Sequence, residues 1–331
     1  MKDEKGSTPK RRGPGVQAPA PVPDPADDAV PGELAPPAIE RQKSPMCRVR
    51  EMSTAARRHE TSCSVEEAKQ ADTPGIVGAA DICFAGLRAD EPAPLLMRHP
   101  EATSTMLEVV LGFDDRVRVT PTLDYPWRCI CMLRVIAADG TQWFGTGWLA
   151  GPRLVVTAGH VVHIAERGGW VREIEVIPAG DGGERPYGST VSRRFRSVGG
   201  WVRDQTPGLD YGAILLPADA AYGGSLGYFG IASVDDQALA GSTVQLSGYP
   251  ADKPTGTQWH HAREILRLEP QILHYDIDTA GGQSGAPVWA EFNAKRYVVG
   301  IHRGGHVTGN SAVRLTDAVY DNIIAWNGEA R

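Results

Sequence analysis

Three short stretches of this sequence carry the residue types that nucleophilic catalysis requires. Ser284 lies in the glycine-rich stretch 281–285, where glycines let the backbone turn sharply and leave N–H groups that can bind an oxyanion. His160 ends the apolar run 154–159, and Asp210 precedes another apolar run at 213–216. The chain order His, Asp, Ser is one in which catalytic triads occur. This pattern favours acyl transfer by a serine nucleophile.

The chemistry of such a nucleophile assigns a role to each residue. Ser284 is the candidate nucleophile and His160 the candidate general base, because a serine hydroxyl is weak until a base takes its proton. Asp210 would hold the imidazole in one tautomer and stabilise its charged form. The backbone N–H groups of Gly282 and Ser284 are the candidate oxyanion hole, where one donor is worth on the order of 3–4 kcal/mol. Activity should rise as His160 deprotonates, at about pH 6–8.

Residues of the same types nearby are weaker candidates. His163 follows His160 closely and would replace it only if the register of the segment were shifted. Asp204 has no apolar strand after it, and Ser311 precedes an apolar strand without flanking glycines. If His160, Asp210 and Ser284 were only structural residues, their occurrence in these three settings and in this order would have to be a coincidence.

Other classes of function find little support in the composition. The formal net charge of −6 argues against nucleic-acid binding, which requires a basic surface. No apolar run reaches the length of a membrane span. His260, His261 and Glu264 resemble part of a metal site, but the segment reads as extended and offers no third ligand. We therefore expect no nucleic-acid or membrane partner, no metal and no cofactor. We also expect a monomer whose substrates are proteins or peptides.

The chain divides into three parts by composition. Residues 1–45 are rich in Pro, Ala and charge, which predicts a disordered tail. Residues 46–108 lack strong periodicity and are typical of a propeptide-like extension. From 109 to 331, short apolar segments alternate with glycine-rich turns and predict an all-β domain that ends in a helix at 316–326. The expected strands are 129–136, 146–149, 153–162, 173–177, 213–216, 243–246, 263–268, 286–289, 297–301 and 312–315.

The five cysteines give weak evidence for a disulfide framework, because their number is odd and their spacing is not repeated. Cys129 and Cys131 lie two apart in a predicted strand, so they share a face and cannot easily bridge each other. We expect buried or free thiols.

Four stretches together resemble the glutamyl endopeptidase branch, staphylococcal V8-like, of the chymotrypsin-fold serine proteases. They are Val156-Thr157-Ala158-Gly159-His160-Val161-Val162, Leu209-Asp210-Tyr211-Gly212-Ala213, Gly248-Tyr249-Pro250-Ala251-Asp252-Lys253-Pro254, and the segment from Asp278 to Gly305. The resemblance covers residues from about 109 to the end. It implies two six-stranded β-barrels with the active site in the cleft between them. The family is secreted, whereas no apolar signal region follows the charged N-terminus here, so the location is left open.

The resemblance also implies which residues bind the substrate. In the family, a threonine before the glycines and a histidine after the serine meet the glutamate carboxylate, and the matching positions are Thr279 and His302. Gly304 and Gly305 would leave the pocket open, and their strand could pair with the substrate backbone. The amine of a mature N-terminus at Val109, released by cleavage after Glu108, would also bind that carboxylate.

Two residues bear on the comparison with trypsin-like proteases: Asp278 matches their pattern, and Gln283 departs from it. Asp278 lies six positions before Ser284, where trypsin-like enzymes keep the acid that binds Lys or Arg. We expect Asp278 to point away from the pocket and glutamate, with aspartate as a second choice, to be preferred. Gln283 stands where trypsin-like zymogens use an aspartate to bind the new amine, so that switch is not expected. The alternatives are a trypsin-like protease of another preference, a protease-fold binding module without activity, or a protease kept silent by its extension.

Overall fold

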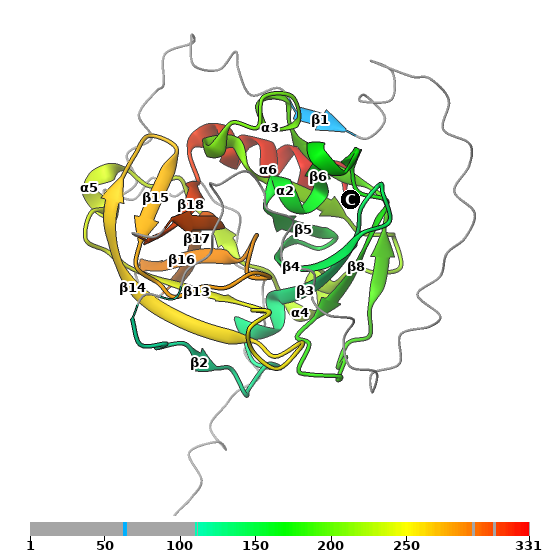
Figure 1. Ribbon diagram of the computed structural model, residues 1–331, viewed down its shortest axis with the longest axis horizontal. Coiled ribbons are helices and arrows are strands. Elements are labelled where there is room, and N and C mark those ends of the chain that lie inside the picture. Colours follow the sequence, from blue (N-terminus) through cyan, green and yellow to red (C-terminus); the bar gives the residue numbers. More distant parts are fainter. Residues whose placement is uncertain (1–61, 65–109, 111, 293–294, 307–308, 331) are drawn as a thin grey trace, which may run out of the picture. The chain divides into compact units, whose positions relative to one another are not determined.

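Two β-sheets carry most of the folded chain (Figure 1). The computed structural model describes residues 62–64, 110, 112–292, 295–306 and 309–330. The predicted tail at 1–45, most of the predicted extension at 46–108, and Val109 lie outside the described residues. All described residues belong to one unit, which spans residues 35–331.

The first sheet forms a half-barrel whose strands are mostly buried on both faces. Its central strands pair antiparallel, so residues far apart in sequence become neighbours: Gly212 of one strand lies opposite Thr157 of the next. The order of the sheet is β1 (Ser62–Ser64), β10 (Phe195–Val198), β11 (Gly212–Leu215), β5 (Leu154–Thr157), β4 (Gln142–Gly151), β3 (Ile130–Ile136), β8 (Glu173–Pro178) and β9 (Thr190–Ser192).

The second sheet closes on itself as a six-stranded barrel. The barrel closes because β17 pairs with both β16 and β18. The order is β12 (Gly230–Ile231), β17 (Lys295–His306), β16 (Pro287–Phe292), β13 (Thr243–Gly248), β14 (Trp259–Leu268), β15 (Ile272–Tyr275) and β18 (Gly309–Arg314), and β2 (Val117–Arg118) pairs with β14. The hairpin of β6 (His163–Ile164) and β7 (Gly169–Trp170) forms a separate two-stranded sheet.

Helices are short except for the last one. The terminal helix α6 (Asp317–Glu329) begins after Thr316, whose side chain accepts a hydrogen bond from the backbone N–H of Val319 and so caps the first turn. The others are α2 (Gly159–Val162), α3 (Gly199–Val202), α4 (Tyr222–Leu226), α5 (Asp236–Leu239) and the 3₁₀ turns η2 (Trp127–Cys129), η3 (Ala165–Arg167) and η4 (Pro207–Leu209). Within the described ranges, no helix is both long and apolar enough to cross a membrane.

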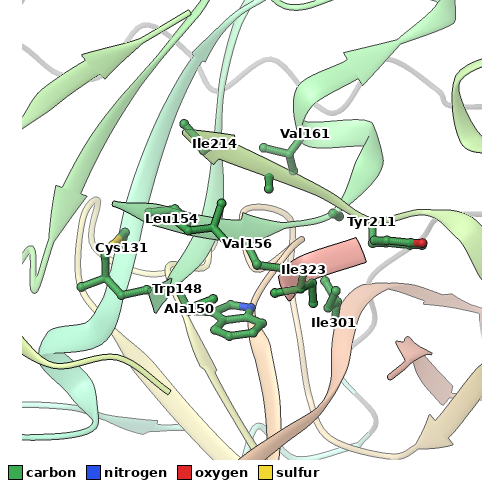
Figure 2. Packing of buried hydrophobic residues seen from close by; sticks show 14 of the residues in the cluster. Cys131, Trp148, Ala150, Leu154, Val156, Val161, Tyr211, Ile214, Ile301 and Ile323 are labelled. Carbon is green, nitrogen blue, oxygen red and sulfur yellow. The ribbon is translucent and has the colours of Figure 1, made fainter. Parts of the chain in front are cut away.

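A single apolar cluster joins the first sheet, part of the second barrel and α6. Trp148 from β4, Ile301 from β17 and Ile323 from α6 are fully buried members of this cluster, and Figure 2 shows them in one packed group. Cys129 and Cys131 belong to it as free, buried thiols, as expected. Burial raises the pKa of the Cys129 thiol to about 12, so it stays protonated. The packed cluster gives the two sheets a shared core.

The all-β class with a terminal helix is confirmed, and one predicted strand is corrected. The expected strand at 153–162 ends at Thr157, and residues Gly159–Val162 form the short helix α2 instead. Ala158 is extended and Gly159 begins the helix, so the chain turns just before His160. The pattern of small and branched residues does not reveal this turn, because a buried helical turn and a buried strand have the same composition over four residues.

Candidate active site

His160 is presented by the turn of α2, directly after strand β5. A Cβ added at Gly159 would lie 2.7 Å from the Trp201 ring, so only glycine allows the chain to pass this close to the tryptophan. The His160 ring then lies edge-on to Trp201, with the ring centroids 6.3 Å apart. The tryptophan therefore packs against both the backbone turn at Gly159 and the imidazole of His160.

Asp210 lies beside this imidazole because β11 pairs with β5. It follows η4 and precedes β11, and it is completely buried. Its Oδ1 accepts a hydrogen bond from the backbone N–H of His160 at 2.8 Å, and its Oδ2 lies 2.8 Å from His160 Nδ1. A carboxylate next to Nδ1 favours the tautomer with hydrogen on Nδ1, which leaves the lone pair of Nε2 to accept a proton.

A buried cation lies behind the same carboxylate. The Arg303 side chain is 6% exposed, and its Nε lies 4.0 Å from Asp210 Oδ2. Its Nη1 donates a hydrogen bond to Ser311 Oγ at 3.1 Å. Arg303 occupies a bulge in β17, where the register with β18 shifts between His302 and Gly304. No local pattern in the sequence indicates that Arg303 lies beside Asp210, because the bulge in β17 that places it there forms only in the folded chain.

Ser284 sits in a tight turn that only glycine neighbours permit. Gly282 has φ +99° and Gly285 has φ +87°, both in the region that favours glycine. A Cβ on Gly285 would lie 2.0 Å from Thr157 Oγ1 and 2.8 Å from the Ala158 nitrogen. The turn therefore packs directly against the residues that lead into His160.

The backbone of this turn is tied to both barrels. The Thr146 backbone N–H donates to the Ser284 carbonyl at 2.9 Å, and the Thr146 hydroxyl donates to the Gly282 carbonyl at 2.7 Å. On the other side, the N–H of Gly285 donates to the His302 carbonyl at 2.7 Å. These bonds direct the carbonyl groups away from the turn, an arrangement that favours N–H groups facing its concave side.

Thr279 and His302, the predicted carboxylate ligands, are both fully buried. Within the described part of the chain, the Thr279 hydroxyl has no hydrogen-bond partner. His302 Nδ1 lies 2.8 Å from the hydroxyl of Tyr275. Burial, together with the nearby His160, lowers the pKa of His302 to about 3, so its ring is neutral near pH 7. In the tautomer in which Tyr275 donates to Nδ1, the ring hydrogen lies on Nε2 and the ring can act as a neutral donor.

Gly304 and Gly305 lie on β17 opposite β18. Gly304 pairs with Ser311 and has φ +129°, and Gly305 pairs with Asn310. A Cβ on Gly305 would lie 2.1 Å from the Asn310 side-chain oxygen, so close packing of the two strands also requires glycine there. The expected reasons for these glycines were an open pocket and pairing with the substrate backbone, and the contact with Asn310 adds a structural reason for Gly305.

Asp278 turns towards the N-terminal segment of the domain. Its carboxylate accepts a hydrogen bond from the backbone N–H of Asp115 at 3.0 Å, and its own N–H donates to His261 Nδ1 at 2.9 Å. Asp115, His261 and Asp278 are close enough to be considered as metal ligands. However, the Nδ1 lone pair of His261 is already occupied by the Asp278 N–H, and Asp115 binds Arg263 at 2.6 Å. These contacts already engage His261 Nδ1 and both carboxylates, whereas His261 Nε2 has no hydrogen-bond partner among the described residues.

The alternative candidates lie in ordinary structural settings. His163 packs edge-on against Trp170, and Asp204 is exposed. Ser311 donates to the Gly304 carbonyl. The His260 ring packs against Trp127 and Trp289, which also contact each other, and its Nε2 lies 3.2 Å from Gln245 Oε1. Glu264 is exposed. Sequence reasoning missed Tyr275, Arg303 and the Arg116 cluster described below, because each acts on residues far away in the chain.

Comparison with known proteins gives matches to peptidases. The model of the family described as trypsin-like peptidase domain matches residues 145–301. A glutamyl endopeptidase of Bacillus licheniformis is 37% identical over 242 residues, which cover 71% of this chain and 74% of that protein. An extracellular metalloprotease of Bacillus subtilis is 33% identical over 219 residues, which cover 66% of this chain and 69% of that protein. A solved Glu endopeptidase in complex with MPD matches with TM-score 0.59 and 28% identity, over 66% of this chain and 100% of that one.

Proposed function

Because the chain belongs to the glutamyl endopeptidases of the trypsin-like peptidase class, we propose that it is a serine endopeptidase that cleaves on the carboxyl side of glutamate. The domain that carries this activity is residues 109–331. All of the proposed site residues come from one chain, so a monomer is sufficient. The substrates are proteins or peptides.

The reaction proceeds through an acyl-enzyme. Ser284 Oγ attacks the scissile carbonyl carbon while His160 Nε2 takes its proton. The N–H groups of Gly282 and Ser284 bind the oxyanion that forms. His160 then gives the proton to the leaving amine as the C–N bond breaks. Water, activated by the same imidazole, attacks the ester, and the acid product and free Ser284 are released.

The observation that carries this proposal is the double contact between His160 and Asp210. The carboxylate holds both the backbone and the ring of the histidine at 2.8 Å. Because Asp210 is fully buried, its charge is available to the imidazolium that forms during attack. A structural aspartate could satisfy itself with backbone groups alone, whereas this one also fixes the tautomer that a general base requires.

The glutamate preference rests on Thr279 and His302. Transfer of a carboxylate from water is costly unless donors meet it. The buried hydroxyl of Thr279, which has no partner in the described chain, supplies one donor. His302, fixed by Tyr275, supplies the second through Nε2. Its low pKa means that the ring binds the carboxylate as a neutral donor, so binding does not require protonation of His302.

The contacts of Asp278 argue against a preference for Lys or Arg. Its carboxylate is 2% exposed and accepts the N–H of Asp115, and it lies 3.5 Å from His261 Nδ1. A group engaged in this way is a poor anchor for a cationic side chain, which would have to displace these contacts.

We also propose that the enzyme matures by its own cleavage after Glu108. The new amine of Val109 would then join the ligands of the substrate carboxylate. N-terminal sequencing of active material should give Val109 as the first residue. A Glu108→Gln variant that still matures at the same bond would contradict self-processing.

A peptide-library cleavage profile tests the proposed function directly. We expect cleavage after Glu, weaker cleavage after Asp, and labelling of Ser284 by a fluorophosphonate probe. Ser284→Ala should abolish both, whereas an Asp204→Asn variant, altered at an exposed aspartate, should retain both. Cleavage mainly after Lys or Arg would overturn the assignment of the pocket, and full turnover by Ser284→Ala would overturn the mechanism.

A further inference from the structure

Arg116 is a fully buried cation outside the proposed triad. Its side chain is 0% exposed, although it lies only two residues after Asp114 in a charged segment. Its Nε and Nη2 donate to the two carboxylate oxygens of Asp114 at 2.9 and 2.8 Å. Its Nη1 lies 3.0 Å from Asp252 Oδ1, and its Nη2 also contacts Asp252 Oδ2. Two carboxylates therefore grip one guanidinium.

The charges of this cluster are balanced. Lys253 Nζ lies 2.5 Å from Asp114 Oδ2, so the cluster contains two cations and two carboxylates. Burial of a charged group is costly unless it is paired and hydrogen-bonded, and a guanidinium can pair with two carboxylates in fixed geometry. Arg116 is thus held rigidly enough to serve as an anchor.

The remaining contact of Arg116 reaches the nucleophile turn. Its Nη1 donates to the side-chain oxygen of Gln283, the residue before Ser284, at 3.3 Å. The same oxygen accepts the N–H of Ala280 at 3.1 Å, and the N–H of Gln283 donates back to the Ala280 carbonyl at 3.1 Å. Gln283 is therefore hydrogen-bonded to Ala280 through both its side chain and its backbone, and Arg116 binds the same side-chain oxygen.

Asp252, the second carboxylate bound by Arg116, connects the cluster to Gly281 at the start of the turn. Asp252 follows Ala251, whose N–H donates to the Gly281 carbonyl at 2.6 Å. Arg116 therefore contacts two segments that shape the nucleophile turn. One is Gln283 within the turn, and the other is Asp252, which follows the Ala251 that binds Gly281. A rigid cation at this junction restricts how the Gly282 and Ser284 N–H groups can turn.

We propose that Arg116 is a positioning residue that orders the oxyanion turn through Gln283, in the place that trypsin-like zymogens fill with a newly released amine. This inference rests on the proposed function. Because Arg116 is part of the chain and needs no cleavage to become charged, the turn is ordered before the extension is removed. Cleavage after Glu108 would then affect recognition of the substrate carboxylate and leave the oxyanion turn unchanged.

The test uses the full-length chain with Arg116→Met, which removes the guanidinium and its charge and keeps an unbranched apolar stem. We expect kcat on a Glu peptide to fall by at least about tenfold while KM changes less than about threefold, because the oxyanion is bound in the transition state. Lys253→Met is the matched control: it breaks an ion pair of the same cluster without touching Gln283, and its kcat should stay within about twofold of wild type.

A second variant covers the case in which Arg116→Met does not fold. Gln283→Met cuts the link from the other side and leaves Arg116 with both of its carboxylates. It should show the same selective loss of kcat, and the double variant should lose no more than the larger single loss, because both act through one contact. Losses that multiply, or folded single variants with wild-type kcat, would overturn the positioning role. Wild-type protein that cleaves no Glu peptide would instead overturn the proposed function.

Discussion

The carboxylate of Asp210 binds His160 twice, through the backbone N–H and through ring Nδ1, each at 2.8 Å. The first contact fixes where the histidine backbone lies, and the second fixes which ring nitrogen carries the hydrogen. Position and tautomer of the imidazole are therefore set by a single buried group.

Replacing this carboxylate by an amide should remove most of the activity. In Asp210→Asn the side chain can donate to Nδ1 and so favours the opposite tautomer, which leaves Nε2 protonated and unable to take the serine proton. We expect kcat to fall by about 10⁴-fold with little change in fold. The measurement is kcat on a Glu peptide alongside circular dichroism, with Asp204→Asn as control. A loss of less than about tenfold would contradict the role of Asp210.

The hydroxyl of Thr279 has no hydrogen-bond partner among the described residues, so its removal should raise stability and lower specificity. Thr279→Val has almost the same shape and removes a buried polar group, so the free energy of unfolding should rise by up to about 1–2 kcal/mol. The same change should lower kcat/KM for Glu peptides by about tenfold or more, since one donor to the carboxylate is lost. Denaturant unfolding and peptide kinetics check both effects. An unchanged kcat/KM for Glu peptides would contradict the proposal that Thr279 binds the substrate carboxylate.

The glycine after the nucleophile should tolerate no side chain. Gly285→Ala combines φ +87° with a Cβ 2.3 Å from the Thr146 carbonyl oxygen. We expect a loss of at least about 3 kcal/mol in the free energy of unfolding. Gly224→Ala is the matched control, because a Cβ there meets nothing within 4 Å, and its effect should stay below about 0.5 kcal/mol. Equal stabilities of the two variants would contradict the geometry of the turn.

The half-buried His260 predicts loss of stability in mild acid. Burial lowers the pKa of His260 from 6.5 to about 4. The unfolded chain therefore binds more protons between these values, and stability falls as the pH drops through this window. His260 alone should account for about 2–3 kcal/mol between pH 7 and pH 4.5.

The variant His260→Phe should flatten that dependence. A phenyl ring can pack against Trp127 and Trp289 in place of the imidazole without taking up a proton. Denaturant unfolding at pH 7 and pH 4.5 would measure the loss in each protein. A variant that loses as much stability as the wild type would show that His260 is not responsible.

Local signals in the sequence were sufficient for the fold class and for the three candidate triad residues. The glycines around Ser284 predict a turn. In the structure Gly282 has φ +99° and Gly285 has φ +87°, values that glycine adopts readily and other residues rarely. The apolar run before His160 predicts a buried strand, and the alternation of short apolar segments with glycine-rich turns predicts an all-β chain. Each of these signals depends on a few consecutive residues.

The tertiary structure alone decided how these residues are supported. The sequence assigns no role to Asp114 and Arg116, yet the docking of this segment buries the guanidinium against Asp252 and Gln283. Tyr275 lies outside every strand expected from the sequence, and its contact with the ring of His302 appears only in the structure. In both cases the partner lies far along the chain, so the contact exists only after the barrel closes. Residue types can indicate which groups do the chemistry, whereas their orientation is set by packing that no local pattern contains.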